Sequence, residues 1–348
     1  GLLAESIGDY HTGLGNLDKA LNYYEKMNRV FYSLQVINPD ELDVQNSLAI
    51  SYSKLGSIHR KLGDLDIALG FFEKYFELEK SLYESHPMNI EIANNLAISY
   101  SKLGSTYSSL GNLEKALEYF EEYYSLEKHL NESYPQSMNF TNNLAISYSK
   151  LGSIYTKLGN LEGALECYEI YNTIAKSLHQ AYPSNVEFSN NLAISYSKLG
   201  AAFSYLGKLD LTLHYYEKYK SIKEELFDRN PQNIEFKNGL AISYSKLGST
   251  HKKLGNLEKA INYFKKYHVV EKSLHESYPK NIEFQNGLAI SCIYLSSCFE
   301  EKDLSKALNY LKQAEDLYDR LVELAPQYQA FQQNRDWVKD KIKGRESC

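Results

Sequence analysis

The chain of 348 residues has only seven prolines, which end helices, and four cysteines, which can cross-link chains, and it has one tryptophan. It has no run of 18 apolar residues, so we expect no transmembrane helix and no membrane partner. Its first residues lack the basic and apolar segments of a signal peptide, and we therefore expect a cytoplasmic protein. The formal net charge is −6, which argues against duplex nucleic acid as the usual partner.

Sequence patterns that accompany catalysis or metal binding are also missing. The chain contains no HExxH, no glycine-rich phosphate loop and no GxSxG. The four cysteines are Cys167, Cys292, Cys298 and Cys348, and none of them forms a CxxC pair. We therefore expect free thiols, no metal site, no cofactor and no enzymatic activity.

The few prolines are evenly spaced. Six recur at intervals of 48 residues, at Pro39, Pro87, Pro135, Pro183, Pro231 and Pro279, and Pro326 falls one residue short of the next interval. Two glycine series have the same period, one from Gly8 to Gly248 and one from Gly15 to Gly255. Because proline ends helices, a loop recurs at a fixed interval, and a period of this length indicates a repeat array.

The string LAISYSKLG locates the repeats, since it occurs five times, starting at Leu48, Leu96, Leu144, Leu192 and Leu240. We expect a single solenoid of about seven repeats, at about 1–47, 48–95, 96–143, 144–191, 192–239, 240–287 and 288–326. The seventh repeat is degenerate, with Ser296 in place of the glycine. An amphipathic segment at about 327–343, with apolar Phe331, Trp337, Val338 and Ile342, is predicted to be a C-terminal capping helix.

Each repeat contains two stretches of helical periodicity. In one of them, apolar residues follow at steps of three and four, at Phe188, Leu192, Tyr196, Leu199, Phe203 and Leu206. This stretch starts after Asn185, a good N-cap, and ends at Gly207. The second stretch of the preceding repeat runs from Leu161 to about Ala181, before Pro183. The sequence therefore predicts an all-α fold of stacked helical hairpins, with 14 repeat helices, a capping helix and no strand.

The repeat resembles the tetratricopeptide repeat (TPR), which places an aromatic residue, Leu-Gly and Tyr on its first helix and Ala and aromatic residues on its second. One repeat has Tyr148, Leu151, Gly152, Tyr155, Ala164, Tyr168 and Tyr171 at the matching spacings. The units are longer than the roughly 34 residues of that family. The resemblance implies a right-handed superhelical solenoid whose first helices line a concave groove that binds a protein or peptide.

Long units of the LAISYSKLG type also resemble those attached to bacterial signalling and defence proteins, beside nucleotide-switch ATPase or caspase-like protease domains. The chain starts at Gly1, without Met and inside a first helix. We therefore expect the sensor or regulatory part of a larger protein.

Aromatic residues recur at core positions of both helices. One series runs from Tyr52 to Tyr244 and another from Tyr75 to Tyr267, each at intervals of 48 residues. Gly152 is predicted to lie where the two helices of a hairpin touch. His11, His59 and His251 stand where other repeats have Tyr or Phe, and we expect them to pack between helices.

Several first-helix positions point away from the predicted core and hardly vary between repeats. The predicted groove residues are Asn94, Asn142, Asn190 and Asn238, then Ile98, Ile146 and Ile194, then Ser101, Ser149 and Ser197, then Lys102, Lys150, Lys198 and Lys246. Asparagine amides can pair with a peptide backbone, and isoleucine supplies apolar contact. The lysines form a basic stripe on an acidic protein, which favours a partner with an acidic segment.

Two alternatives stay open at this point. Recent duplication would keep these residues identical without any selection for binding. The array could also be a structural or oligomerisation spacer whose ends, rather than its groove, make the contacts. The oligomeric state stays open as well.

Overall fold

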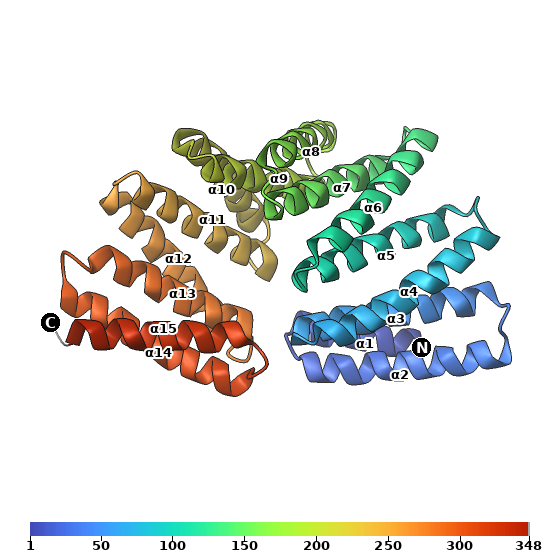
Figure 1. The fold of residues 1–348 in the computed structure, drawn as a ribbon, viewed down its shortest axis with the longest axis horizontal. Coiled ribbons are helices and arrows are strands. Elements are labelled where there is room, and N and C mark those ends of the chain that lie inside the picture. The colour runs from blue at the N-terminus through green and yellow to red at the C-terminus, as the bar shows by residue number, and fades with distance from the viewer. Residues whose placement is uncertain (347–348) are drawn as a thin grey trace. The chain divides into compact units, whose positions relative to one another are not determined.

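The computed structural model describes residues 1–346, which form 15 α-helices and no strand. The helices are α1 (Leu2–Gly13), α2 (Leu17–Ile37), α3 (Leu42–Leu62), α4 (Leu65–Ser85), α5 (Ile90–Ser109), α6 (Leu113–Ser133), α7 (Met138–Lys157), α8 (Leu161–Ala181), α9 (Val186–Tyr205), α10 (Leu209–Arg229), α11 (Ile234–Lys253), α12 (Leu257–Ser277), α13 (Ile282–Phe299), α14 (Leu304–Leu324) and α15 (Gln329–Glu346). The predicted set of 14 repeat helices and one further helix is confirmed (Figure 1).

Odd-numbered helices up to α13 are the first helices of their repeats, and even-numbered helices are the second. The chain divides into two compact units, one from Gly1 to Leu178 and one from His179 onward. Within each unit the helices of a hairpin pack together, as α3 and α4 or α11 and α12 do. A second helix also packs against the next first helix, as α4 does on α5 and α12 on α13. Neighbouring repeats therefore bury one another's apolar stripes.

The first helices α5, α7, α9, α11 and α13 begin at a side chain that accepts backbone N–H groups. The Oδ1 atom of Asn185 accepts from the backbone of Glu187 at 2.9 Å and of Phe188 at 3.1 Å. The same kind of cap is formed by Asn89, Ser137, Asn233 and Asn281. The hairpin turn contains a glycine in the left-handed region, such as Gly207 with φ of +70°, where other residues are strained. These are the helix limits that the sequence predicts.

The two helices of a hairpin approach closely at a glycine. A Cβ atom added to Gly152 would lie 2.6 Å from the Cε1 atom of Tyr168, which confirms the predicted contact. The same relation joins Gly8 to Tyr24, Gly56 to Phe72, Gly104 to Phe120, Gly200 to Tyr216 and Gly248 to Phe264. In the seventh repeat Ser296 and Leu311 occupy the two equivalent positions, so a larger residue on the first helix accompanies a smaller one on the second.

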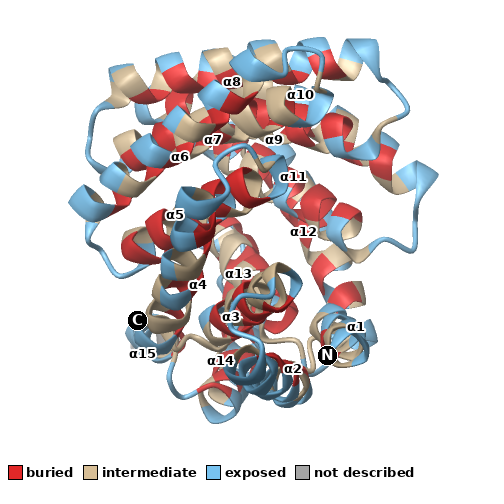
Figure 2. Ribbon diagram, turned by 90° about the vertical axis from the view of Figure 1, so that its right-hand side faces the viewer, coloured by how far each residue is buried: buried red, intermediate tan, exposed pale blue. Residues whose placement is uncertain are grey.

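Buried and exposed stripes alternate along the helices (Figure 2). The second-helix series Tyr75, Tyr123, Tyr171, Tyr219 and Tyr267 is buried, and the first-helix series Tyr52, Tyr100, Tyr148, Tyr196 and Tyr244 is buried or half-buried. Three histidine rings stack on aromatic rings of the second helix, His11 on Tyr23, His59 on Phe71 and His251 on Tyr263, at 5.5–5.7 Å between ring centroids. The predicted packing role of these histidines is confirmed.

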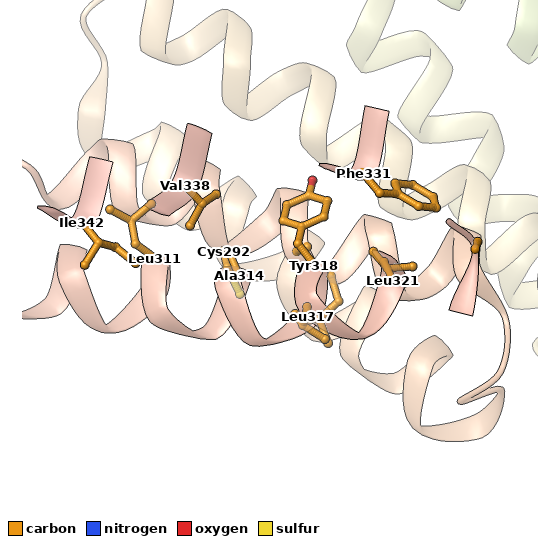
Figure 3. Close-up of a cluster of buried hydrophobic side chains, with 12 residues drawn as sticks. Cys292, Leu311, Ala314, Leu317, Tyr318, Leu321, Phe331, Val338 and Ile342 are labelled. Atoms are coloured by element: carbon orange, nitrogen blue, oxygen red, sulfur yellow. The ribbon is translucent and has the colours of Figure 1, made fainter. Parts of the chain in front are cut away.

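The last helix, α15, covers the apolar face of α14 (Figure 3). Phe331, Val338 and Ile342 are buried in one cluster with Leu311, Tyr318 and Leu321. Trp337, which the sequence placed on the same apolar face, is instead 46% exposed. The segment predicted at about 327–343 forms a helix from Gln329 to Glu346.

Three cysteines, Cys167, Cys292 and Cys298, are buried free thiols, and Cys348 lies outside the described residues. Burial raises the pKa of the Cys292 thiol to about 12, so it stays protonated and is a poor nucleophile. Among residues 1–346, no group of three or more His, Cys, Asp and Glu side chains could hold a metal ion. No helix in that range has both the length and the apolar composition needed to cross a membrane.

Candidate functional site

On each first helix the predicted groove residues lie on one side, which we call the first-helix face. On α5 they are Asn94, Ile98, Ser101 and Lys102, whose spacing places them on one side of the helix. Equivalent residues lie on α7 in the first unit and on α9 and α11 in the second. Side chains of this face join neighbouring first helices within a unit through hydrogen bonds.

Asparagines form one of these links. Asn95 Nδ2 donates to Asn46 Oδ1 at 3.0 Å, which joins α5 to α3. Asn143 Nδ2 donates to Asn94 Oδ1 at 3.1 Å, which joins α7 to α5. Asn142 is buried, with 3% of its surface exposed, whereas Asn94, Asn190 and Asn238 are half-buried. Part of the hydrogen-bonding capacity of these amides is therefore used inside the protein.

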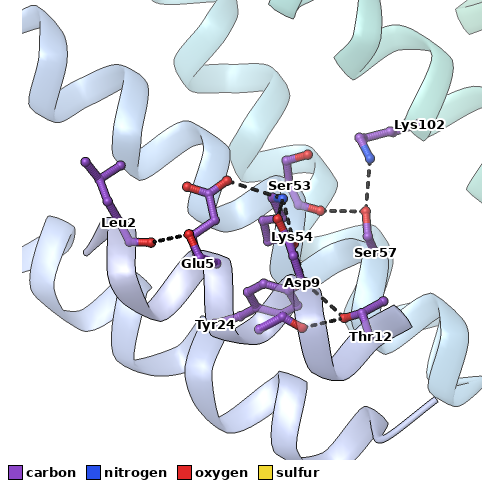
Figure 4. A network of polar contacts seen from close by, with 11 residues as sticks. Leu2, Glu5, Asp9, Thr12, Tyr24, Ser53, Lys54, Ser57 and Lys102 are labelled. Carbon is purple, nitrogen blue, oxygen red and sulfur yellow. Dashed lines mark hydrogen bonds and ion pairs between the residues drawn. The ribbon is translucent and has the colours of Figure 1, made fainter. Parts of the chain in front are cut away.

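Lysines form the second link (Figure 4). Lys102 Nζ donates to Ser57 Oγ at 2.9 Å and lies 5.3 Å from the centroid of the Phe72 ring. Lys150 repeats this arrangement one repeat later, with Ser105 at 3.2 Å and the Phe120 ring at 6.0 Å. The ammonium group of each lysine thus lies between a hydroxyl of the preceding first helix and an aromatic ring of the preceding second helix.

Partial burial changes the acidity of these lysines. Burial, together with the nearby Arg60, Lys54 and Lys150, lowers the pKa of Lys102 to about 8. The pKa of Lys246, which lies 5.1 Å from the Tyr216 ring, is lowered by burial and by Lys198. At neutral pH Lys102 carries a positive charge that water screens less than it screens a fully exposed charge.

The first repeat differs from the others at this link. Asp9 stands where later repeats have Ser57 and Ser105, and Lys54 Nζ donates to both of its carboxylate oxygens at 2.8 Å. Lys54 also lies 3.2 Å from the Glu5 carboxylate. Carboxylates of the first repeat therefore pair with Lys54, whereas Lys102 donates to a serine hydroxyl at the same place.

The apolar and small residues of the face differ in exposure. Ile98 is 37% exposed, and its counterpart Ile242 is 40% exposed. Ile146 and Ile194 are half-buried, as are Ser101, Ser197 and Lys198. Ser149 is buried, with 9% of its surface exposed. The face thus combines apolar patches with serine hydroxyls and ammonium groups.

Sequence reasoning missed a series of buried ionisable residues on the second helices. Glu79, Glu127, Lys223 and Glu271 recur at multiples of 48 residues and are all at least nine-tenths buried. The carboxyl groups of Glu79 and Glu127 lie beside the Asn95 and Asn143 amides of the next first helix. Their sequence position could have revealed them, because each lies four residues after a buried tyrosine and therefore on the same side of the helix.

The buried lysine and the third glutamate accompany a glycine instead of an asparagine on the next first helix. A Cβ atom on Gly239 would lie 2.9 Å from Lys223 Cε, and one on Gly287 would collide with the Glu271 carboxylate. Lys223 Nζ reaches past Gly239 and donates to Asn190 Oδ1 at 2.5 Å. The glycines therefore make room for the longer or charged side chains.

Burial shifts the pKa of each of these four residues in the direction that favours the uncharged side chain. It raises the pKa of Glu79 to about 8, with a contribution from Glu91, and the pKa values of Glu127 and Glu271 to about 7. Burial lowers the pKa of Lys223 to about 8. The interfaces between repeats thus contain groups that titrate near neutral pH.

Comparison with known proteins identifies the repeat. Family models described as tetratricopeptide repeat match residues 47–128, and also residues 145–176 and 241–267. The chain is a tetratricopeptide repeat array. TPR arrays are protein–protein interaction modules, they generally bind proteins or peptides, and the fold is generally non-catalytic.

Solved structures agree on the fold of this TPR array. BtubC (BKLC) from P. vanneervenii is similar with a TM-score of 0.56 and 17% identity, over 74% of this chain and 92% of that chain. The apo form of RapI is similar with a TM-score of 0.60 and 15% identity, over 92% of this chain and 98% of that chain. At these identities the likeness concerns the fold alone. No curated protein matches the sequence.

Proposed function

We propose that this TPR array is a non-catalytic module that binds a segment of a partner protein on its first-helix face, as the sensor or regulatory part of a larger protein. The observation that supports the proposal is the recurrence of the same donors at the same places on consecutive first helices. Lys102 and Lys150 are each held between a serine and an aromatic ring of the preceding repeat.

The chemistry of the face favours an acidic segment. An ammonium group has three N–H donors, so the bond from Lys102 to Ser57 leaves donors for a carboxylate. Ile98, more than one third exposed, offers apolar contact beside Lys102. The protein as a whole carries a net charge of −6, so a row of lysines on one face steers an acidic segment to that face.

The lysines that recur on successive first helices, from Lys102 to Lys246, form a ladder. The distance between its steps sets the interval at which we expect binding groups in the partner sequence. Packed helices lie about 10 Å apart, and an extended chain advances about 3.3 Å per residue. One step of the ladder therefore spans roughly three residues of an extended partner. We expect acidic or hydrogen-bonding groups at about every third residue, or an acidic face on a helical partner.

The test uses a dodecapeptide phage library selected on the full chain, followed by fluorescence anisotropy with the synthetic consensus peptide. The variant Lys102→Met/Lys150→Met/Lys198→Met removes three charges of the face but keeps apolar stems of similar length, which at positions 102 and 150 lie near the Phe72 and Phe120 rings. We expect the Kd of the peptide to rise about tenfold at low salt and by less at high salt.

A matched control is Lys74→Met/Lys80→Met/Lys115→Met on the second helices. These lysines also lie over aromatic rings, those of Tyr52, Phe76 and Tyr107, and the change in net charge is the same. The control should change the Kd by less than about twofold. Equal losses in both variants would contradict the proposal and favour the spacer interpretation.

A further inference from the structure

The first-helix face changes its chemistry at the seventh repeat. At the position of Lys54, Lys102, Lys150, Lys198 and Lys246, helix α13 has Tyr294. At the preceding serine position it has Ile293. Helix α13 therefore presents a branched apolar and an aromatic side chain where α3, α5, α7, α9 and α11 present a serine and a lysine.

These two residues line a pocket between α11 and α13 that opens to solvent. Its volume is about 500 Å³, and its lining consists of Ser249, Lys252, Lys253, Phe264, Ile293, Tyr294 and Ser297. The ring centroids of Tyr294 and Phe264 lie 4.9 Å apart. In earlier repeats a lysine ammonium group lies over the ring equivalent to Phe264, as the ammonium group of Lys102 lies over Phe72. Here a second ring replaces that charge, and the floor of the pocket becomes apolar.

Two lysines stand at the mouth of this pocket. Lys252 Nζ donates to the Ser297 carbonyl at 3.1 Å and to its Oγ at 2.7 Å, which holds it against α13. Lys253 Nζ donates to Ser204 Oγ at 3.2 Å, which directs it toward α9. Both lysines are exposed, and both retain donor capacity for a carboxylate.

We propose that this pocket receives an aromatic side chain of the partner segment, and that Lys252 and Lys253 bind a carboxylate next to it in the partner sequence. The inference rests on the proposed function, because it names the residue that anchors the same segment. The ring of the partner would pack on Phe264, Ile293 and Tyr294, while its acidic neighbour stays at the rim.

Two physical arguments favour this occupant. The volume lies within the range of pockets that enclose small organic groups, about 300–1,000 Å³, which is ample for one aromatic side chain. An aromatic anchor in a desolvated pocket, surrounded by charged contacts, is also the usual arrangement of binding hot spots. A ladder of identical residues would bind the partner equally well if the partner were shifted by one repeat. The aromatic anchor removes this ambiguity, because it fits a pocket formed by the seventh repeat.

The experiment compares the full chain with Tyr294→Lys, which gives α13 the residue found in five other repeats. A dodecapeptide phage library is selected on the natural chain, and the consensus peptide is titrated against both proteins by fluorescence anisotropy. We expect a consensus with an aromatic residue next to Asp or Glu, and a Kd that rises about tenfold with Tyr294→Lys. The matched control Tyr205→Lys changes an exposed tyrosine of α9 outside the pocket and should have less than a twofold effect.

A second variant tests the same pocket independently, in case Tyr294→Lys does not fold. Lys252→Gln/Lys253→Gln alters only exposed residues and should weaken the same peptide severalfold, with a smaller effect at high salt. A consensus without an aromatic–acid pair, or a Kd unchanged by both pocket variants, would overturn the inference.

The outcomes also separate this inference from the proposed function. If Lys102→Met/Lys150→Met/Lys198→Met weakens the peptide and the pocket variants do not, the first-helix face binds peptides and only the pocket assignment is wrong. If no peptide is enriched on the natural chain, both are wrong.

Discussion

At the scale of the residue, the glycine series sets the distance between the two helices of a hairpin. Glycine is a poor helix former, so a substitution by alanine normally stabilises a helix by about 1 kcal/mol. At Gly152 the added Cβ would lie 2.6 Å from the Tyr168 ring, and the ring or the helix must move. We predict that Gly152→Ala lowers the free energy of unfolding by about 1–3 kcal/mol, measured by thermal and urea denaturation.

The control for this prediction is Gly70→Ala in α4. Gly70 lies inside a helix, and a Cβ atom there would meet nothing within 4 Å. This variant should be stabilised by up to about 1 kcal/mol, so the two alanine substitutions should have opposite signs. A gain in stability from Gly152→Ala would mean that the ring at Tyr168 moves aside without cost.

Buried carboxyl groups give a second prediction at this scale. In the folded protein the pKa of Glu127 is about 7, compared with 4.5 for a solvated glutamate. The folded state therefore binds a proton that the unfolded state releases, and the contribution of Glu127 to stability is fully present below pH about 4.5 and is lost as pH rises through about 7. We predict that Glu127 accounts for a loss of about 3 kcal/mol between these limits, and that Glu127→Gln removes this part of the pH dependence.

The measurement is thermal melting of the natural chain and the variant across that pH range. Glu132→Gln, on the exposed side of the same helix, is the control and should leave the profile unchanged. Parallel pH profiles for the natural chain and Glu127→Gln would show that the carboxyl group is solvated in the folded state.

Residue roles were predictable from sequence wherever one residue type recurs with the period. Gly152 and the three stacked histidines are examples, because their partners recur as well. Glu127 was not, because a glutamate in an acidic second helix has the composition of a solvated surface, and only packing places it inside. The internal bonds of Asn94 and Lys102 depend on the distance between helices, which composition does not specify.

At the scale of the element, the side-chain caps determine where first helices begin. Asn185 satisfies two backbone N–H groups of α9, whereas Asn256 precedes α12 without a side-chain capping bond. We predict that Asn185→Ala lowers stability by about 1 kcal/mol and that Asn256→Ala has a much smaller effect, both measured by thermal melting. Equal losses would indicate that helix packing, and not the cap, fixes the start of α9.

The helix limits were predictable because Asn, Gly and Pro recur in the turns of most repeats. The last helix was less so, since it has no copy elsewhere in the chain. Its predicted limits are a few residues off, and Trp337 faces outward because Phe331, Val338 and Ile342 already cover α14.

At the scale of the whole molecule, stability is the sum of repeats and of the contacts between neighbours. Removing α15 by ending the chain at Tyr328 exposes Leu321 and Tyr318, which are fully buried in the intact chain. We predict that hydrogen exchange becomes faster in α13 and α14 of the shortened chain and stays unchanged in α3 to α6. Trp337→Ala, which changes a half-exposed side chain, is the control and should leave both regions protected.

Uniform acceleration of hydrogen exchange along the shortened chain would contradict this prediction, because it would mean that the array unfolds as one cooperative body.

At this scale the sequence predicts the architecture but not the partner. The all-α architecture and the number of helices followed from the 48-residue period together with the three-and-four spacing of apolar residues inside each repeat. The partner and its binding site do not follow from the period, since identical repeats are expected both from selection and from duplication.

The buried residues that differ between repeats have a consequence for folding. Hairpins of nearly identical sequence can stack out of order, with one repeat skipped, and most of their contacts would still form. The interface of α10 with α11, however, needs Gly239 to admit Lys223, whereas that of α4 with α5 holds Glu79 beside Asn95. An order that set Lys223 against Asn95 or Asn143 would be overpacked, because no glycine would make room for the lysine side chain. These side chains therefore disfavour assemblies in which α10 packs on a first helix that has an asparagine at this position, while they leave the asparagine-bearing helices interchangeable.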